Sequence, residues 1–209
     1  MNRYELKLDS LTKYFGRRLV FRDLNIEYCQ CGIYGISGPN GSGKSTLLKI
    51  IAGISTPSKG KITHTAEGKE IDTAEIHERI GFVSPYLVLY EEFSCRENIE
   101  IMGKIRGIEP DEPHITRLLE TFGLADRQND RLKFYSSGMK QRMKFIFALL
   151  HKPALLILDE PTENLDNEGK NKIYELIKNY SASNIVLIAS NEDSDLQLCT
   201  SSINLLEHK

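Results

Sequence analysis

Residues 38–46 read GPNGSGKST, and this stretch decides the fold. Its glycines let consecutive backbone N–H groups turn toward one point, because a residue without a Cβ adopts such conformations at little cost. The helix expected to begin near Gly43 adds unpaired N–H groups and the positive end of its dipole. Lys44 can reach β- and γ-phosphates, and the Ser45 hydroxyl can ligate Mg²⁺. The stretch predicts a nucleoside triphosphate site made of Gly38, Pro39, Asn40, Gly41, Ser42, Gly43, Lys44, Ser45 and Thr46.

The residues on either side of this loop support the prediction. Residues 32–36 have the composition of a buried strand, and apolar residues recur at helical spacing over 47–52. A strand, a glycine-rich loop and a helix form the arrangement in which such loops bind phosphate, whereas a surface turn requires neither element.

Composition limits the other classes of function. The chain has 209 residues, enough for one well-formed core, and its 27 basic and 29 acidic residues are dispersed. No basic tract points to nucleic acid, and no apolar run reaches the length of a membrane span or signal peptide. Four scattered cysteines do not make a disulfide framework, and we expect Cys29 and Cys31 to be buried or half-buried at a strand end. These features indicate a cytosolic protein.

The order of predicted elements indicates an α/β fold interrupted by a helical region. Strands are expected at 3–9 and 20–29 with a turn at 15–16, then short strands and a small helix over 61–83. Residues 84–151 look helical, with helices near 95–106, 112–123 and 138–151, and a core stripe at Met139, Met143, Ile146 and Leu150. Separators between the helices are Gly107, Pro110, Pro113 and Gly123. A strand at 154–158, a helix at 167–180 and strands at 184–189 and 202–206 complete the pattern.

Two carboxylates, Asp159 and Glu160, follow the apolar run 155–158. Such a run predicts a strand buried on both faces, and ligands bind at the carboxyl ends of parallel strands. Asp159 is suited to hold Mg²⁺ directly or through water, and Glu160 to polarise a water that attacks the γ-phosphate. A solvated strand end is the alternative, which the presence of the phosphate loop disfavours.

At this point the chain resembles the nucleotide-binding subunit of an ATP-binding cassette (ABC) transporter over essentially its whole length. The motifs follow in the family's order: the phosphate loop, a helical insertion, the segment YSSGMKQR at 135–142 and the segment LDEPT at 158–162. The first segment matches the family's Leu-Ser-Gly-Gly-Gln signature with substitutions at Tyr135, Ser137 and Met139. The resemblance implies one domain over 1–209: a P-loop NTPase core with an antiparallel β subdomain (1–83 and 152–209) and an inserted helical subdomain (84–151).

The resemblance also implies cofactors, partners and further site residues. ATP and Mg²⁺ are the expected ligands, and Ser136 and Gly138 would contact ATP held by a second subunit in a head-to-tail dimer. Phe15 matches the aromatic residue that stacks on adenine, with Tyr14 as the neighbouring alternative and a core aromatic as the other interpretation. Asp166 would help join the subunits, or cap a helix, or both.

Two positions depart from the family's pattern. Pro85 stands where a glutamine usually contacts Mg²⁺ and the attacking water, and Asn191 where a histidine usually contacts the γ-phosphate. Proline has no hydrogen-bonding side chain, and asparagine can donate a hydrogen bond but cannot carry the charge. Ser84 and Ser190 are candidate substitutes. With proline at this position, the chain resembles the branch of short ABC subunits that includes the haem-exporter ATPase of cytochrome c maturation.

Large apolar residues crowd the segment 85–93, which in the family forms a groove for a helix of the membrane subunit. Packing inside the helical region is the alternative. The sequence thus predicts an ATP-hydrolysing subunit, peripheral on the inner face of the cell membrane, that powers a separate permease, with no nucleic-acid partner. Two rival hypotheses are an ABC ATPase acting on a non-membrane partner and an ATP-gated switch with little hydrolysis.

Overall fold

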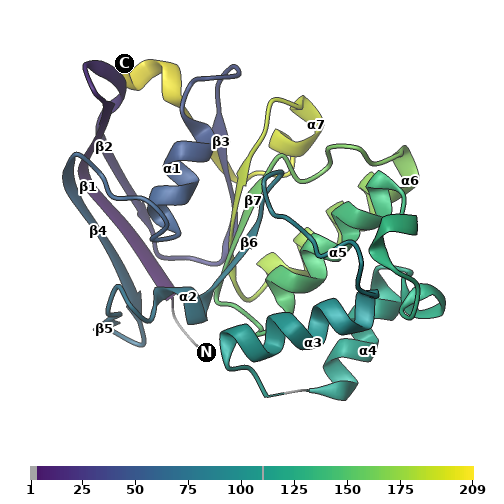
Figure 1. Ribbon diagram of the computed structural model, residues 1–209. Helices are drawn as coiled ribbons and strands as arrows, with labels where there is room; N and C mark the ends of the chain where they lie inside the picture. Colours follow the sequence, from purple (N-terminus) through teal and green to yellow (C-terminus); the bar gives the residue numbers. More distant parts are fainter. Residues whose placement is uncertain (1–3, 110) are drawn as a thin grey trace.

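Two sheets and a group of helices make up the computed structural model, which describes residues 4–109 and 111–209 (Figure 1). Arg3, expected at a strand start, and Pro110, expected as a break between helices, lie outside the described residues. Helix α1 (Lys44–Ile51) lies between the antiparallel sheet and the central parallel sheet, and helices α3 to α6 cover the opposite side.

The antiparallel sheet has the order β2-β1-β4-β5, with β1 at Tyr4–Phe15, β2 at Arg18–Tyr28, β4 at Lys59–Ala66 and β5 at Lys69–Glu70. The turn at 15–16 joins β1 to β2 as predicted, but β1 runs six residues beyond the predicted end at residue 9. The alternation of apolar residues stops at Ser10, which has a φ of 47°. The pairing of β1 with β2 shifts register between Leu8 and Leu11. A strand prediction based on strict alternation of apolar and polar residues ends at such a shift, although the strand continues beyond it.

The parallel sheet has the order β6-β7-β8-β3-β9. Its strands are β3 (Gly32–Ser37), β6 (Ile80–Val83), β7 (Leu155–Asp159), β8 (Ile185–Ala189) and β9 (Ser201–Asn204). Successive residues of β7 and β8 pack into two different hydrophobic clusters: Leu155 and Ile157 face α1 and the antiparallel sheet, whereas Leu156 and Leu158 face the helices. These strands are therefore buried on both faces, as the continuous apolar runs predicted.

The helices agree closely with the predicted segments. After α1 come α2 (Ile76–Arg79), α3 (Cys95–Arg106), α4 (Glu112–Thr121), α5 (Ser137–Leu149), α6 (Asn167–Ser181) and α7 (Asp193–Leu196). In α3 the Ser94 and Glu97 side chains each accept from the other's backbone N–H, which fixes the helix start. The predicted core stripe is confirmed: Met143, Ile146 and Leu150 are buried, and Met139 packs against them. Helix α7 was not predicted, because four residues are too few to show a helical period.

Two expectations from composition, on membrane spans and on the burial of two cysteines, can be compared with the structure. Among residues 4–109 and 111–209, no helix is both long and apolar enough to cross a membrane. Cys29 is half-buried as expected, but Cys31 is exposed, so the prediction for Cys31 was wrong. Cys31 lies in the short connection between the end of β2 at Tyr28 and the start of β3 at Gly32.

The buried His64 on β4 makes stability depend on pH. Its side chain is 2% exposed, and the Tyr4 hydroxyl lies 2.7 Å from Nδ1. Burial lowers the pKa of His64 from 6.5 to about 4. Between these values the unfolded chain binds more protons than the folded chain, so the free energy of unfolding falls as the pH falls.

We expect His64→Gln to reduce this pH dependence. Between pH 7 and 5, protonation of His64 in the unfolded state should remove about 2 kcal/mol of stability from the wild-type chain but not from the variant. Urea unfolding at the two pH values measures the difference, and comparison within each protein removes any constant effect of the substitution. Equal losses in both proteins would contradict the prediction.

Candidate active site

Three neighbouring parallel strands end at one edge of the sheet and bring the candidate residues together. The phosphate loop follows β3, Glu160 follows β7, and Ser190 and Asn191 follow β8. Because β8 pairs with both β7 and β3, the three segments are neighbours in space. The carboxyl edge of a parallel sheet is where ligands bind in α/β folds.

The loop conformation requires glycine at two positions in particular. Gly38 has a φ of 141°, and a Cβ there would lie 2.7 Å from Ser42 Oγ. Gly43, immediately before α1, has a φ of 112°, and its Cβ would lie 2.5 Å from Val20 Cγ1. Both the left-handed backbone and the close neighbours therefore exclude side chains, so the loop can present its N–H groups to a phosphate.

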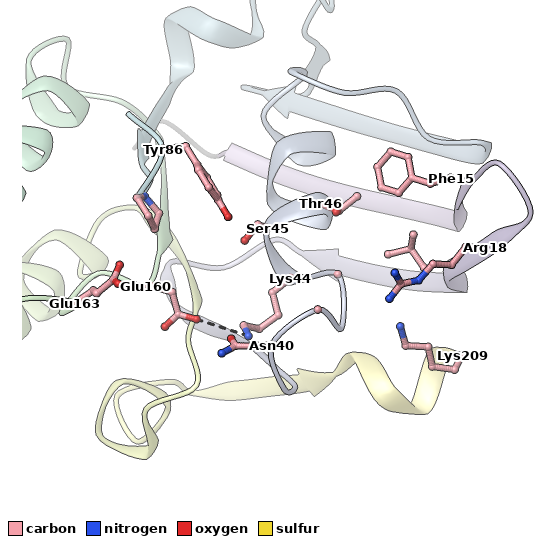
Figure 2. Close-up of a pocket in the computed structure, with 14 residues that line it drawn as sticks. Phe15, Arg18, Asn40, Lys44, Ser45, Thr46, Tyr86, Glu160, Glu163 and Lys209 are labelled. Carbon is pink, nitrogen blue, oxygen red and sulfur yellow. Dashed lines mark ion pairs between the residues drawn. The ribbon is translucent and has the colours of Figure 1, made fainter. Parts of the chain in front are cut away.

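Lys44 lies at the centre of the site and is only 5% exposed. Its Nζ donates to the Gly38 carbonyl at 2.8 Å and to Asn191 Oδ1 at 2.6 Å. The same Nζ lies 3.6 Å from Glu160 Oε1, in the ion pair marked in Figure 2. Asn191 Nδ2 in turn donates to Asn40 Oδ1, which links the end of β8 to the phosphate loop. Two neutral oxygens and the Glu160 carboxylate therefore surround the Lys44 ammonium beside the loop.

Asp159 and Ser45 fit a Mg²⁺ site. The Ser45 hydroxyl donates to Asp159 Oδ1 at 3.1 Å, whereas the buried Asp159 Oδ2 has no hydrogen-bond partner among the described residues. Burial raises the pKa of Asp159, and the Ser45 hydrogen bond acts against this. A buried carboxylate oxygen without a partner suits a cation. No group of three His, Cys, Asp or Glu side chains in the described residues could hold a metal, so the ion would need phosphate oxygens as further ligands, as Mg²⁺ commonly does.

Glu160 turns from the strand end toward Lys44. It has a φ of 50°, an uncommon conformation for a residue with a side chain, and its N–H donates to the Ala189 carbonyl at 2.8 Å. Its Oε2 accepts from Ser190 Oγ at 3.1 Å and from the Asn191 N–H at 3.3 Å. Such a conformation at a strand end is typical of functional sites, where the surroundings hold the backbone in place.

A cavity of about 720 Å³ lies over the loop. Phe15 lines this cavity and is 57% exposed, whereas Tyr14 is not among its lining residues. Five further lining residues were not among the predicted nucleotide-site residues: Arg18, Val20, Tyr86, Glu163 and Lys209. Arg18 pairs with Phe15 across the hairpin, so the turn at 15–16 was an available signal. Lys209, at the C-terminal end of the chain, contacts the phosphate loop: its Nζ donates to the Ser42 carbonyl at 3.1 Å. No local sequence pattern indicates this contact.

Ser136 and Gly138 do not line this cavity. Ser136 caps α5, its hydroxyl accepting from the Met139 N–H at 3.2 Å, and Gly138 lies against the Asn164 carbonyl. Asp166 caps α6 by accepting from the Gly169 N–H at 2.8 Å. The structure therefore brings the loop, Asp159, Glu160, Asn191 and Phe15 together, and leaves the 136–138 segment apart from them.

The two departures from the family pattern have different surroundings. Pro85 lines the cavity, and its carbonyl accepts from Lys144 Nζ at 3.0 Å. Ser84 is not among the lining residues, and its hydroxyl accepts from the Tyr86 N–H. Ser190 contacts Glu160 directly, so of the two candidate substitutes only Ser190 touches a candidate catalytic residue.

Comparison with known proteins agrees with this geometry. Residues 21–163 match the ABC transporter family. The chain is 32% identical over 185 residues to the linearmycin resistance ATP-binding protein LnrL of Bacillus subtilis, covering 88% of this chain and 60% of LnrL. It is also 32% identical over 185 residues to the lantibiotic transport ATP-binding protein SrtF of Streptococcus pyogenes, covering 88% of this chain and 79% of SrtF. The chain thus spans less than two thirds of LnrL.

A solved structure matches over nearly the whole chain. The ATP-binding cassette MJ0796, in a dimeric post-hydrolysis state bound to ADP and Pi, is 25% identical, with a TM-score of 0.83 and coverage of 95% of this chain and 93% of that one. The family match includes the phosphate loop, the 135–142 segment and Glu160. The chain therefore belongs to the ABC transporter family.

Proposed function

We propose that this chain binds and hydrolyses ATP to power a separate membrane permease. The observation that supports this most strongly is the convergence of Lys44, Ser45, Asp159 and Glu160 on one phosphate-binding loop. A loop that binds phosphate alone would not need a carboxylate beside the lysine. A carboxylate beside the phosphate loop, able to accept a proton from water, is the group that hydrolysis requires.

Each residue has a defined role in this proposal. Lys44 neutralises charge on the β- and γ-phosphates, and Glu160 orients or activates the attacking water. Ser45 and Asp159 would hold Mg²⁺, which neutralises further phosphate charge when bound with ATP. Asn191 donates a hydrogen bond near the γ-phosphate, and Phe15 stacks on the adenine. The glycine-rich loop, residues 38–43, and Thr46 surround the phosphates.

The proposed working unit is a dimer, with an identical chain or a second ATPase subunit. Ser136 and Gly138 would complete the site of the partner, which is consistent with their position outside the cavity of their own chain. The positive end of the helix dipole at the start of α5 suits a phosphate brought by that partner. Asp166 would lie near the same interface. The dimeric structure of MJ0796 supports this arrangement by analogy.

The proposed permease contact is the segment 85–93, on the helical subdomain assigned to 84–151. Tyr86, Val88, Tyr90 and Phe93 are exposed, whereas Leu89 is buried, so part of the segment packs locally and the rest does not. Val88 and Leu89 line a cavity of about 460 Å³ beside α5. The two acidic residues of the segment are paired with lysines, Glu91 with Lys140 at 2.6 Å and Glu92 with Lys133 at 2.9 Å. An exposed apolar surface of this kind suits a short helix from a membrane protein.

The experiment that tests this proposal compares membrane association of the wild-type chain and Val88→Glu. Val88 is 80% exposed and does not line the nucleotide cavity, so the variant should fold and bind ATP normally. We expect the wild-type chain to co-fractionate with membranes from its own cells, and Val88→Glu to lose most of this association. The control is Glu168→Gln, an exposed change on α6.

A wild-type chain that stays in the supernatant with a non-membrane partner would contradict the permease and favour the first rival hypothesis. Equal membrane association of wild type and Val88→Glu would contradict the proposed contact surface. The peripheral location at the inner face of the membrane is part of the same proposal.

A further inference from the structure

We propose that Ser190 and Asp195 are positioning residues that hold the Glu160 carboxylate in the geometry required for hydrolysis. This inference rests on the proposed hydrolytic role of Glu160. It arises from three hydroxyls around the buried Asp195 of α7: the buried Thr162 after β7, the half-buried Tyr174 on α6 and the buried Ser190 after β8.

Asp195 is the centre of this group and is 1% exposed. Thr162 Oγ1 lies 2.9 Å from Oδ1 and 3.1 Å from Oδ2, and the Tyr174 hydroxyl donates to Oδ1 at 2.8 Å. Ser190 Oγ lies 2.7 Å from Oδ2. A buried carboxylate is costly without donors, so these contacts fix the three hydroxyl side chains relative to one another.

Ser190 connects this group to the active site. Its side chain is fully buried, and its Oγ accepts from the Glu192 N–H at 3.0 Å. The single hydroxyl proton faces two carboxylate oxygens, Asp195 Oδ2 at 2.7 Å and Glu160 Oε2 at 3.1 Å. Because Thr162 lies within hydrogen-bonding distance of both Asp195 oxygens, Asp195 keeps a donor when Ser190 turns its proton to Glu160.

Glu160 needs such support because its side chain is 25% exposed and has several rotatable bonds. With Ser190 donating, Oε2 accepts from two consecutive residues, since the Asn191 N–H lies 3.3 Å away. Oε1 remains beside Lys44 at 3.6 Å and is free to face a water. A group that acts on a reacting water loses much of its effect when its position varies by about an ångström.

Three variants test this role in the full chain. Ser190→Ala and Tyr174→Phe each remove one hydroxyl that contacts Asp195, but only Ser190 also contacts Glu160. We expect Ser190→Ala to lower kcat about tenfold, in line with the cost of a misplaced catalytic group. The Kd for Mg-ATP should change less than about twofold in both variants, and Tyr174→Phe, whose hydroxyl contacts Asp195 but not Glu160, should lose much less of kcat than Ser190→Ala. Ser190→Thr, which retains the hydroxyl, should recover at least half of the lost rate.

A double variant separates positioning from general damage. If Ser190 acts through Glu160, then Ser190→Ala should produce no further loss in a Glu160→Gln background, measured by single turnover. A wild-type kcat in Ser190→Ala, an equal loss in Tyr174→Phe, or an additive loss in the double variant would overturn the inference. A wild-type chain that binds Mg-ATP without turnover would instead overturn the proposed function, which is a distinguishable result.

Discussion

Lys44→Ala should weaken ATP binding about 100-fold, or about 2.7 kcal/mol, with little loss of folded protein. Lys44 is buried beside the loop. Its ammonium group donates to the Gly38 carbonyl of the loop at 2.8 Å. Charge-assisted hydrogen bonds are worth about 1.5–3 kcal/mol each, and the phosphates would lose at least one. Titration with a fluorescent ATP analogue in the presence of Mg²⁺ measures the affinity.

The matched control is Lys49→Ala on the same helix. Lys49 lies over the Tyr86 ring at 4.5 Å and does not line the nucleotide cavity, so its loss should change the affinity by only a fewfold. If Lys44→Ala and Lys49→Ala bound ATP equally well, the assignment of the phosphate loop would be wrong.

Glu160→Gln should reduce ATP turnover between about 100- and 1,000-fold while leaving ATP affinity nearly unchanged. The amide keeps the size of the side chain and can still lie beside Ser190 and Asn191, but it cannot accept a proton from water. Steady-state phosphate release and equilibrium binding measure the two quantities separately. Glu168→Gln, the same substitution on the exposed face of α6, serves as the control and should retain the wild-type rate.

Equal loss of binding and turnover in Glu160→Gln would mean that Glu160 supports the site structurally. Unchanged turnover would mean that another group activates the water. Asn191 contacts both Lys44 and Glu160 and can orient a water, but its amide cannot take the proton, so that group would have to be another one.

Most of the fold could be predicted because its signals are local. The apolar runs of β7 and β8 and the helical period of α5 depend on neighbouring residues only. The motif spacing then identified the family, which the comparisons confirmed. The resemblance to the haem-exporter branch, drawn from Pro85, stays a prediction.

Features that depend on contacts distant in sequence could not be predicted. The contact of Lys209 with Ser42 joins residues 167 positions apart, and no periodicity announces it. The contact between Ser190 and Asp195 crosses only five residues, but its importance depends on Glu160, which lies 30 positions away. Likewise, the pairing of Glu91 with Lys140 joins residues far apart in the sequence, so the sequence of the 85–93 segment alone does not show that this charge is paired.

Pro85 and Asn191 remain the features that most favour a slow or switch-like ATPase. The structure gives Asn191 contacts with Lys44, Asn40 and Glu160, so it is integrated into the site. Pro85 contributes its carbonyl to Lys144 and no side-chain donor. These two positions together predict a slower hydrolysis than that of a site with glutamine and histidine.

The most direct test of the central claim is phosphate release from Mg-ATP by the purified wild-type chain, measured beside Glu160→Gln. The account predicts turnover that saturates with ATP in the wild type and falls at least about 100-fold in the variant. ATP binding with no phosphate release above the Glu160→Gln level would contradict hydrolysis by this chain and would favour an ATP-gated switch.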